Sequence, residues 1–157
     1  MNKQNIKIYA IWIIVAEAVG ALSGYLSRGG MEYYSSAVEQ PALSPPAILF
    51  PIVWGILYCL MGIGAARIYI TMLSPERNKG LNLYVAQLIV NFFWSLIFFN
   101  AQAYGFAFFW LLLLFLLVLW MTVTFYKTDP LAAYLQILYL LWLAFAAYLN
   151  AGVWYLN

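Results

Sequence analysis

The sequence has 157 residues, of which 67% are hydrophobic and only 8% are charged. Soluble domains carry about 25% charged residues, so this composition excludes a soluble globular fold. It also excludes a disordered chain, which needs low hydrophobicity and high charge. The net charge of +2, without a basic run, predicts no nucleic-acid partner. Since a spanning helix takes about 20 apolar residues, the chain has room for roughly five spans.

Continuous apolar runs predict an all-α integral membrane protein, a five-transmembrane-helix bundle that forms one domain. The expected spans are residues 8–26, 47–71, 81–101, 105–125 and 131–156. Turn-forming residues separate them, notably at 74–80 and 127–130. Pro130 suits the first turn of the last span, with Asp129 or Thr128 as its cap.

Only one connection is long, the segment 27–46 between the first two spans. Pro41, Pro45 and Pro46 restrict its backbone and make it stiff. A stiff loop beside the mouth of a bundle can act as a lid, whereas a plain connector has the same composition. Both interpretations stay open at this point.

Basic residues predict the orientation of the bundle. The side that holds the N-terminus carries six of them, and the other side carries only Arg28: the six are Lys3, Lys7, Arg67, Arg77, Lys79 and Lys127. Cytoplasmic loops are enriched in Lys and Arg, so we expect the N-terminus in the cytoplasm and the C-terminus outside. The loop charges and the size suit a bacterial plasma membrane.

The chain has no histidine and a single cysteine, Cys59. It therefore lacks the commonest metal and heme ligand as well as the commonest general base. No nucleophile elbow, phosphate loop or paired acidic motif is present. We expect no metal site and no resident cofactor. Aromatic residues, by contrast, make up 20% of the chain, and interfacial belts account for only part of them.

Polar and aromatic residues recur on one face of three expected spans. Polar groups at membrane depth normally face the bundle interior. The third span carries Gln87, Asn91 and Ser95 beside Trp94 and Phe98; the fifth carries Trp142, Ala146 and Asn150 beside Tyr139 and Phe145; the second carries Trp54, Tyr58 and Gly62. These stripes predict a flat-walled, weakly polar pocket for a large planar ligand. The alternative is packing between helices.

Glu17 lies inside the first span, where a carboxylate is a functional candidate. It suits the proton-coupling group of a small-molecule exporter. A protonated or near-interface carboxyl bonded to another helix is the alternative. Ala16, Gly20 and Gly24 repeat at four-residue spacing and predict close helix packing.

Several motifs resemble the translocator protein family, also called the tryptophan-rich sensory protein (TspO/MBR) family. Residues 50–62 (FPIVWGILYCLMG) resemble its second-span signature, and Pro41 with Ser44-Pro45-Pro46 resembles its first loop. Asn91, Trp94, Ser95 and the Phe98-Phe99 pair resemble its third span. Tyr139, Trp142, Phe145 and Asn150 resemble its fifth span. The match runs in order from about residue 10 to the C-terminus.

The resemblance implies a five-helix bundle, often a homodimer, with a pocket beneath the first loop. Family members bind tetrapyrroles such as protoporphyrin IX, as well as sterols and drug-like small molecules. Trp54 and Trp142 match tryptophans linked to light-dependent porphyrin breakdown, where they would act as redox relays. Together the stripes and the resemblance predict these ligand-binding residues: Tyr34, Pro45, Trp54, Tyr58, Asn91, Trp94, Ser95, Phe98, Tyr139, Trp142, Ala146 and Asn150.

The expected function is a membrane receptor or sensor for tetrapyrroles and other flat ligands, with porphyrin degradation as a further activity and the exporter as the alternative. The chain departs from the family pattern at four places, one of which is Leu138 where the fifth span of the family has Pro before Tyr. The Trp of the loop motif is Leu43, and Tyr33 competes with Tyr34 as the inward tyrosine. No basic residue follows Lys127, so the C-terminal sterol motif is incomplete.

Overall fold

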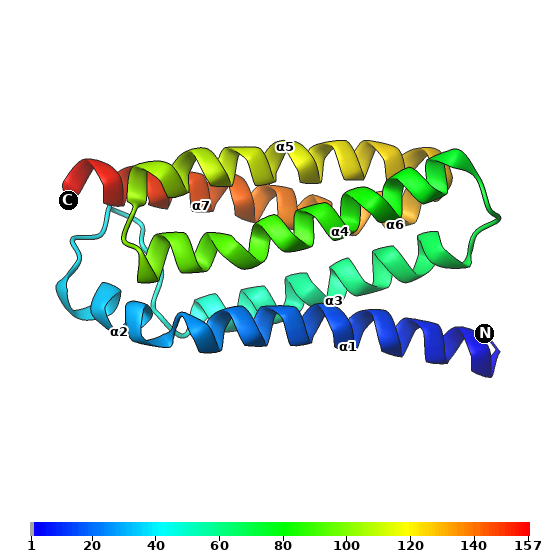
Figure 1. Cartoon of the computed structure of the whole chain (residues 1–157), viewed down its shortest axis with the longest axis horizontal. Coiled ribbons are helices and arrows are strands. Elements are labelled where there is room, and N and C mark those ends of the chain that lie inside the picture. The colour runs from blue at the N-terminus through cyan, green and yellow to red at the C-terminus, as the bar shows by residue number, and fades with distance from the viewer. Residues whose placement is uncertain (1) are drawn as a thin grey trace.

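Five long helices run side by side in an elongated bundle, with the two termini at opposite ends (Figure 1). The computed structural model describes residues 2–157. Each of the five is long and apolar enough to cross a membrane: α1 (Lys3–Leu26), α3 (Leu49–Ile70), α4 with the π-helical turn η1 (Pro75–Asn100), α5 (Tyr104–Thr128) and α6 with α7 (Pro130–Leu156). The expected all-α fold with five spans is confirmed.

Local capping explains where the third and fifth spans begin. The side chain of Ser74 accepts a hydrogen bond from the backbone N–H of Arg77 at 3.1 Å, and Pro75 occupies the first turn. Helix α4 (Pro75–Ser95) therefore starts at Pro75 rather than at residue 81, because a Ser-Pro pair begins a helix as well as it makes a turn. At the fifth span Asp129 caps α6 (Pro130–Tyr134) by accepting from the N–H of Leu131 at 3.2 Å.

The segment expected to be a loop contains a helix. Helix α2 spans Arg28–Ala37, and residues 38–48, here called the strap, run from it to α3. The expectation of a loop over 27–46 was wrong at α2, because Gly29 and Gly30 indicated a chain break. A Cβ at Gly30 would collide with the backbone carbonyl of Phe99, so this glycine allows α2 to press against η1 (Leu96–Asn100).

The half of the bundle near the N-terminus is solidly packed. Helices α1 and α3 cross closely at Gly62, where a Cβ would lie 2.6 Å from the Cα of Ile13. Large side chains fill the space between the helices, among them Tyr84, Tyr139, Phe125 and Met61. Arg67 and Asp129 form an ion pair with a 2.7 Å N–O distance, which joins α3 to the start of α6.

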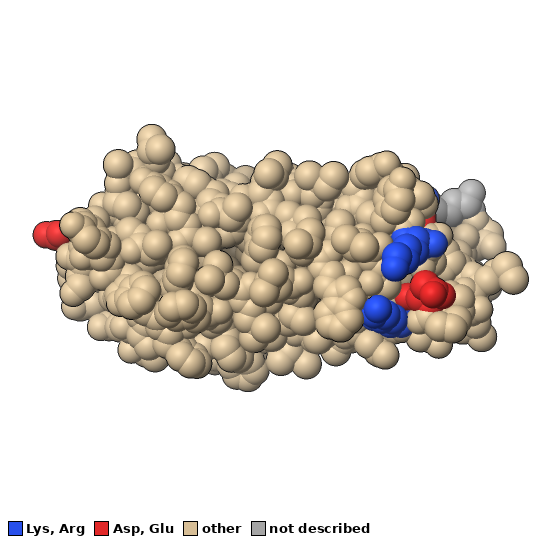
Figure 2. Space-filling model, turned by 90° about the horizontal axis from the view of Figure 1, so that it is seen from above, with Lys and Arg blue, Asp and Glu red and all other residues tan. Residues whose placement is uncertain are grey.

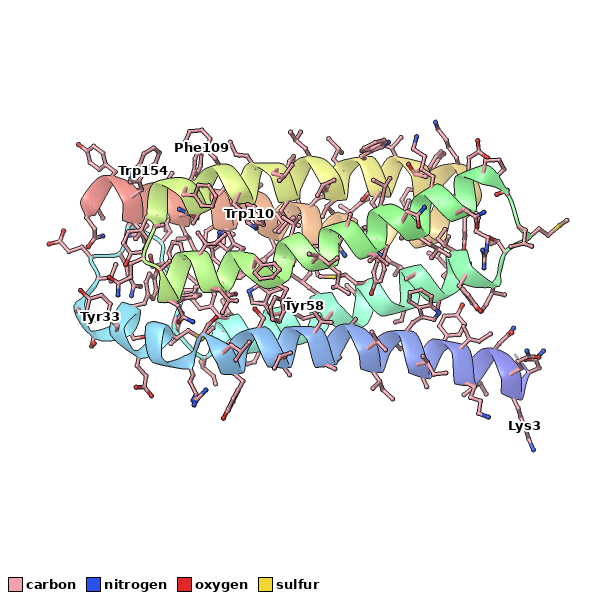
Figure 3. All side chains as sticks on the ribbon, in the orientation of Figure 1. Lys3, Tyr33, Tyr58, Phe109, Trp110 and Trp154 are labelled. Atoms are coloured by element: carbon pink, nitrogen blue, oxygen red, sulfur yellow. The ribbon has the colours of Figure 1, made fainter. Side chains whose placement is uncertain are left out.

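Apart from Glu17 on the cavity wall, charged side chains lie near the two ends of the bundle. On the face shown in Figure 2, no Lys, Arg, Asp or Glu lies in the long central region. Figure 3 places Lys3 at one end and Tyr33 at the other, with the aromatic Phe109, Trp110 and Trp154 nearer the second end. A charge-free belt between two polar ends is the surface that a bilayer requires. The chain is an integral membrane protein. The end that carries α2 and the strap is called the lid end below.

Candidate ligand-binding site

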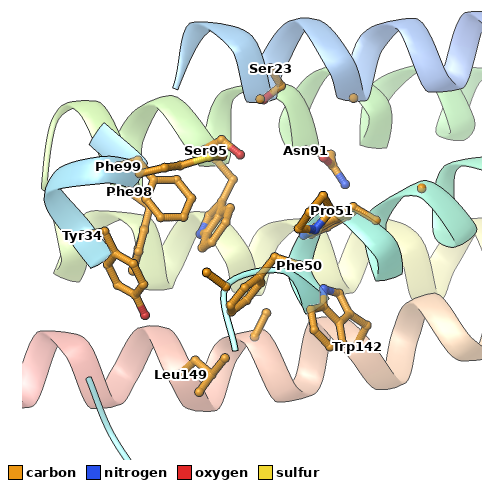
Figure 4. A pocket seen from close by; sticks show the side chains of 18 of the residues that line it. Ser23, Tyr34, Phe50, Pro51, Asn91, Ser95, Phe98, Phe99, Trp142 and Leu149 are labelled. Atoms are coloured by element: carbon orange, nitrogen blue, oxygen red, sulfur yellow. The ribbon is translucent and has the colours of Figure 1, made fainter. Parts of the chain in front are cut away.

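The bundle is hollow at the lid end. A cavity of about 820 Å³ lies between α1, α3, α4 and α7 (Ile137–Leu156), with α2 and the strap over it (Figure 4). This volume lies within the usual range of small-molecule pockets, about 300–1,000 Å³. Aromatic rings and small residues make up most of the lining, and polar groups are few.

The expected site residues come together here, with one exception. Those that line the cavity are Tyr34, Pro45, Trp54, Tyr58, Asn91, Trp94, Ser95, Phe98, Trp142, Ala146 and Asn150. The exception is Tyr139, which is fully buried and lies below the cavity rather than on its surface. Tyr139 lies one helical turn before Trp142 on α7, at a level where this face of the helix meets the packed core and not the cavity.

Tyr139 belongs to a chain of buried hydrogen bonds below the cavity. The hydroxyl of Tyr58 donates to Oδ1 of Asn91 at 2.7 Å, and Nδ2 of Asn91 donates to the hydroxyl of Tyr139 at 2.7 Å. Tyr139 in turn donates to Oε1 of Gln87 at 2.7 Å. These four residues come from α3, α4 and α7 and are called the buried polar chain. Because an unpaired polar atom at this depth is costly, the pairing fixes all four side chains.

The wall formed by α4 ends in a π-helical turn. The N–H of Ala101 donates to the carbonyl of Leu96, five residues earlier, at 2.9 Å. The wider turn brings Phe98 and Phe99 against α2, where Tyr34 lies 5.6 Å and 5.4 Å from their ring centres. Such turns are frequent at functional sites. Here the turn joins the wall of the cavity to the helix that covers it.

The indole N–H groups of Trp94 and Trp142 differ in their hydrogen bonding. Nε1 of Trp94 donates to Oδ1 of Asn150 at 3.2 Å, while the ring stacks on Phe98 at 4.9 Å. Nε1 of Trp142 is buried and has no hydrogen-bond partner in residues 2–157. A buried N–H normally has a partner; this one has no surface open to the cavity, and Trp142 contributes its ring to the lining.

Trp54 and Trp142 face the cavity from different helices. The ring of Trp54 lies 5.6 Å from that of Tyr58 and 6.3 Å from that of Tyr139. The ring of Trp142 meets Phe50 edge-on at 5.9 Å. Phe50 precedes Trp54 by one helical turn, so the 3.6-residue period alone places it on the lining, although the motif-based prediction did not include it.

Tyr34, rather than Tyr33, is the inward tyrosine of α2. Tyr33 is 47% exposed and lies at the lid end (Figure 3), whereas Tyr34 lines the cavity. Burial, with a smaller contribution from the nearby Tyr104, raises the pKa of Tyr34 to about 12. The phenol therefore stays protonated at physiological pH and can donate a hydrogen bond. Leu43 of the strap has a φ of 69° and is 81% exposed, so it does not cover the cavity.

The strap is fixed to the lid end of α7. The hydroxyl of Tyr148 donates to the carbonyl of Ala42 at 2.7 Å. Nδ2 of Asn157 donates to the carbonyl of Glu39 at 2.9 Å, and Oδ1 accepts from the N–H of Glu39 at 3.2 Å. At Gly152 an added Cβ would lie 2.5 Å from Cβ of Pro41. Three contacts thus hold the strap over the cavity.

The wall formed by α1 was missed by the sequence interpretation. Gly20 and Gly24 were expected in close packing, yet only Gly20 is packed, against the ring of Tyr58. A Cβ at Gly24 would meet no atom within 4 Å, and both glycines line the cavity together with Ala21. A stripe of small residues has the same spacing whether it faces a helix or an empty space, so the sequence alone cannot separate the two.

Gly152→Val should loosen the strap, because the added side chain would push Pro41 off α7. We expect amide hydrogen exchange in residues 38–48 to accelerate by roughly tenfold, about 1.4 kcal/mol of lost local stability. Gly29→Val is the matched control, since a Cβ there meets nothing within 4 Å. Unchanged exchange in Gly152→Val, or equal acceleration in both variants, would show that the Pro41 contact does not hold the strap.

Known proteins resemble this chain along its whole length. Residues 12–156 match the model of the TspO/MBR family. Protein CrtK of Rhodobacter capsulatus is 32% identical over 98% of this chain and 94% of its own, and tryptophan-rich protein TspO of Chlorobaculum tepidum is 32% identical over 100% and 99%. The translocator protein of Sus scrofa is 37% identical over 87% and 84%. The chain, with its five spans and its aromatic cavity under α2, therefore belongs to the TspO/MBR family.

Proposed function

We propose that this membrane protein is a receptor or sensor that binds tetrapyrroles of the protoporphyrin IX type, and other flat hydrophobic ligands, in the cavity under α2. The observation that carries the proposal is the cavity of about 820 Å³ with indole rings from three helices, Trp54, Trp94 and Trp142. Indole faces stack on extended planar ligands. The tetrapyrrole is a ligand here and not a resident cofactor.

The polar atoms of the cavity add a preference. Tyr34 lines the cavity as a neutral phenol. Since the sequence has no histidine to bind a heme iron, metal-free porphyrin should bind at least as well as heme.

Titration of the purified protein with protoporphyrin IX in the dark should give saturable quenching of tryptophan fluorescence. The double variant Trp54→Phe/Trp142→Phe should show weaker binding and less quenching, because two stacking faces are smaller. Trp120→Phe/Trp154→Phe is the control, since these indoles are about half exposed and do not line the cavity. Absence of saturation, or the same change in both double variants, would contradict binding in the cavity.

Light-dependent degradation of the bound porphyrin is a further activity of the same site. The ring centre of Trp54 lies 5.6 Å from that of Tyr58 and 6.3 Å from that of Tyr139, so an electron that leaves its indole can be replaced from these neighbouring rings. Illumination of the complex under oxygen should bleach the Soret band and give an oxidised product by mass. Equal bleaching of free porphyrin in detergent would eliminate the activity and leave the binding proposal intact.

A proton-coupled exporter is the second candidate, and the position of Glu17 on the cavity wall favours it. In this mechanism the carboxyl would exchange a proton for the ligand. Proteoliposomes with an imposed pH gradient should then transport an aromatic substrate, and Glu17→Gln should abolish the dependence on the gradient. Transport that is the same in both proteins would exclude this mechanism.

We also propose that the N-terminus is cytoplasmic and the C-terminus outside, in a bacterial plasma membrane. The bundle places Lys3 and the α3–α4 turn at one end and Arg28 at the other, in keeping with the enrichment of basic residues on the cytoplasmic side. A reporter that works only in the cytoplasm should be active when fused before Asn2 and silent when fused after Asn157. The reverse pattern would show the opposite orientation.

A further inference from the structure

The cavity has polar groups at the end away from the lid, besides those nearer the lid such as Gln40, Ser95 and Asn150. On each lining helix, the lining residue furthest from the lid is polar or carries a polar atom: Glu17 on α1, Tyr58 on α3, Asn91 on α4 and Trp142 on α7. These four residues are called the floor. Figure 4 shows Asn91 and Trp142 on the side of the cavity opposite Tyr34. Above the floor the lining is mainly aromatic rings, prolines and small residues.

Glu17 is the charged floor residue, and its carboxyl has no partner in the described part of the chain. Tyr58 and Asn91 are bonded to each other, whereas no hydrogen bond or ion pair involves the carboxyl of Glu17 among residues 2–157; the ion pair found there is Arg67–Asp129. Glu17 is also the single charged residue of the described lining. A carboxylate in apolar surroundings is stable only with a proton or a cationic partner. The described lining supplies no cation, so Glu17 either holds a proton or pairs with a cation that a ligand brings.

The face of α1 towards the lid is open at Gly24 and covered at Gly20. Its lining residues there are Gly20, Ala21, Ser23 and Gly24; a Cβ at Gly24 would meet no atom within 4 Å, whereas one at Gly20 would collide with the ring of Tyr58. A planar ligand can therefore lie against α1 at Gly24 and extend a short arm past the ring of Tyr58 to the carboxyl. The ring of Tyr58 packs on Gly20, one turn from Glu17. A carboxylate next to an aromatic ring is the combination that binds ammonium groups, through a charge-assisted hydrogen bond and a cation–π contact.

We propose that Glu17 and the ring of Tyr58 form a subsite for a protonated nitrogen at the floor of the cavity. The ligands selected are flat aromatic molecules that carry an ammonium or amidinium group on a short arm. The proposal rests on the proposed function only in using the same cavity. It also fixes how an anionic porphyrin lies, because Glu17 repels its carboxylates, which then point towards the lid.

The test compares three ligands: a planar aromatic with an alkylammonium arm, its N-acetylated neutral analogue, and protoporphyrin IX. Binding to the purified full chain is followed by calorimetry at neutral pH. The wild type should bind the ammonium ligand about tenfold more tightly than the neutral analogue, a typical effect of a partly buried charge pair. Glu17→Gln should remove that preference by weakening the ammonium ligand alone. Protoporphyrin IX should bind this variant equally well or more tightly.

Two further variants separate a direct contact from a change in net charge or shape. Glu32→Gln removes the same charge from the exposed face of α2 and should leave all three affinities unchanged. Glu17→Asp keeps the charge and should retain part of the preference. Equal binding of the ammonium and neutral ligands by the wild type, or equal weakening of both in Glu17→Gln, would overturn the subsite while leaving the cavity as a binding site. Failure of all three ligands to bind would overturn the proposed function as well.

Discussion

The buried polar chain of Tyr58, Asn91, Tyr139 and Gln87 is the interaction on which the remaining architecture depends. Inside a bilayer apolar packing does not by itself drive helices together, because lipid tails are as apolar as leucine. Hydrogen bonds between helices therefore determine which faces meet. Such bonds contribute only about 0.6 kcal/mol each, whereas an unpaired buried group costs about 1–3 kcal/mol. The buried polar chain thus acts mainly by excluding other registers of α3, α4 and α7. It marks the boundary between the packed half of the bundle and the hollow half.

The hollow half depends on contacts at its edge. Filling the space between α1 and α3 at this end would need large side chains, yet the residues there are Gly20, Ala21, Gly24 and Gly55, and Gly24 and Gly55 face open space. An empty volume loses contacts for every atom that lines it, so other contacts must hold the lid end together. They come from the π-helical turn against α2 and from the strap bonded to α7. These contacts lie at the rim, where they can open without disturbing the buried polar chain.

Much of this was predictable from the sequence, and the failures have physical reasons. Five spans follow from apolar length alone, and the stripes around Trp54, Asn91 and Trp142 follow from helical periodicity. Helix α2 was missed because Gly29 and Gly30 resemble a chain break, although Gly30 serves close contact with Phe99. Tyr139 was placed in the lining because periodicity gives the inward face of a helix but not whether that face meets a cavity or the core. The family motifs supplied Tyr34 and Pro45, which no periodic pattern contains.

The division of the cavity into aromatic walls and a polar floor bears on what it can do. The rings of Trp54, Trp94 and Trp142 act on any planar surface, so they give affinity with little selectivity. Selectivity must come from the few polar atoms, since a buried group that a ligand leaves unpaired costs more than a stacking contact gains. At the floor the group that no atom of residues 2–157 pairs with is the carboxyl of Glu17, so it decides which edge of a flat ligand can lie there.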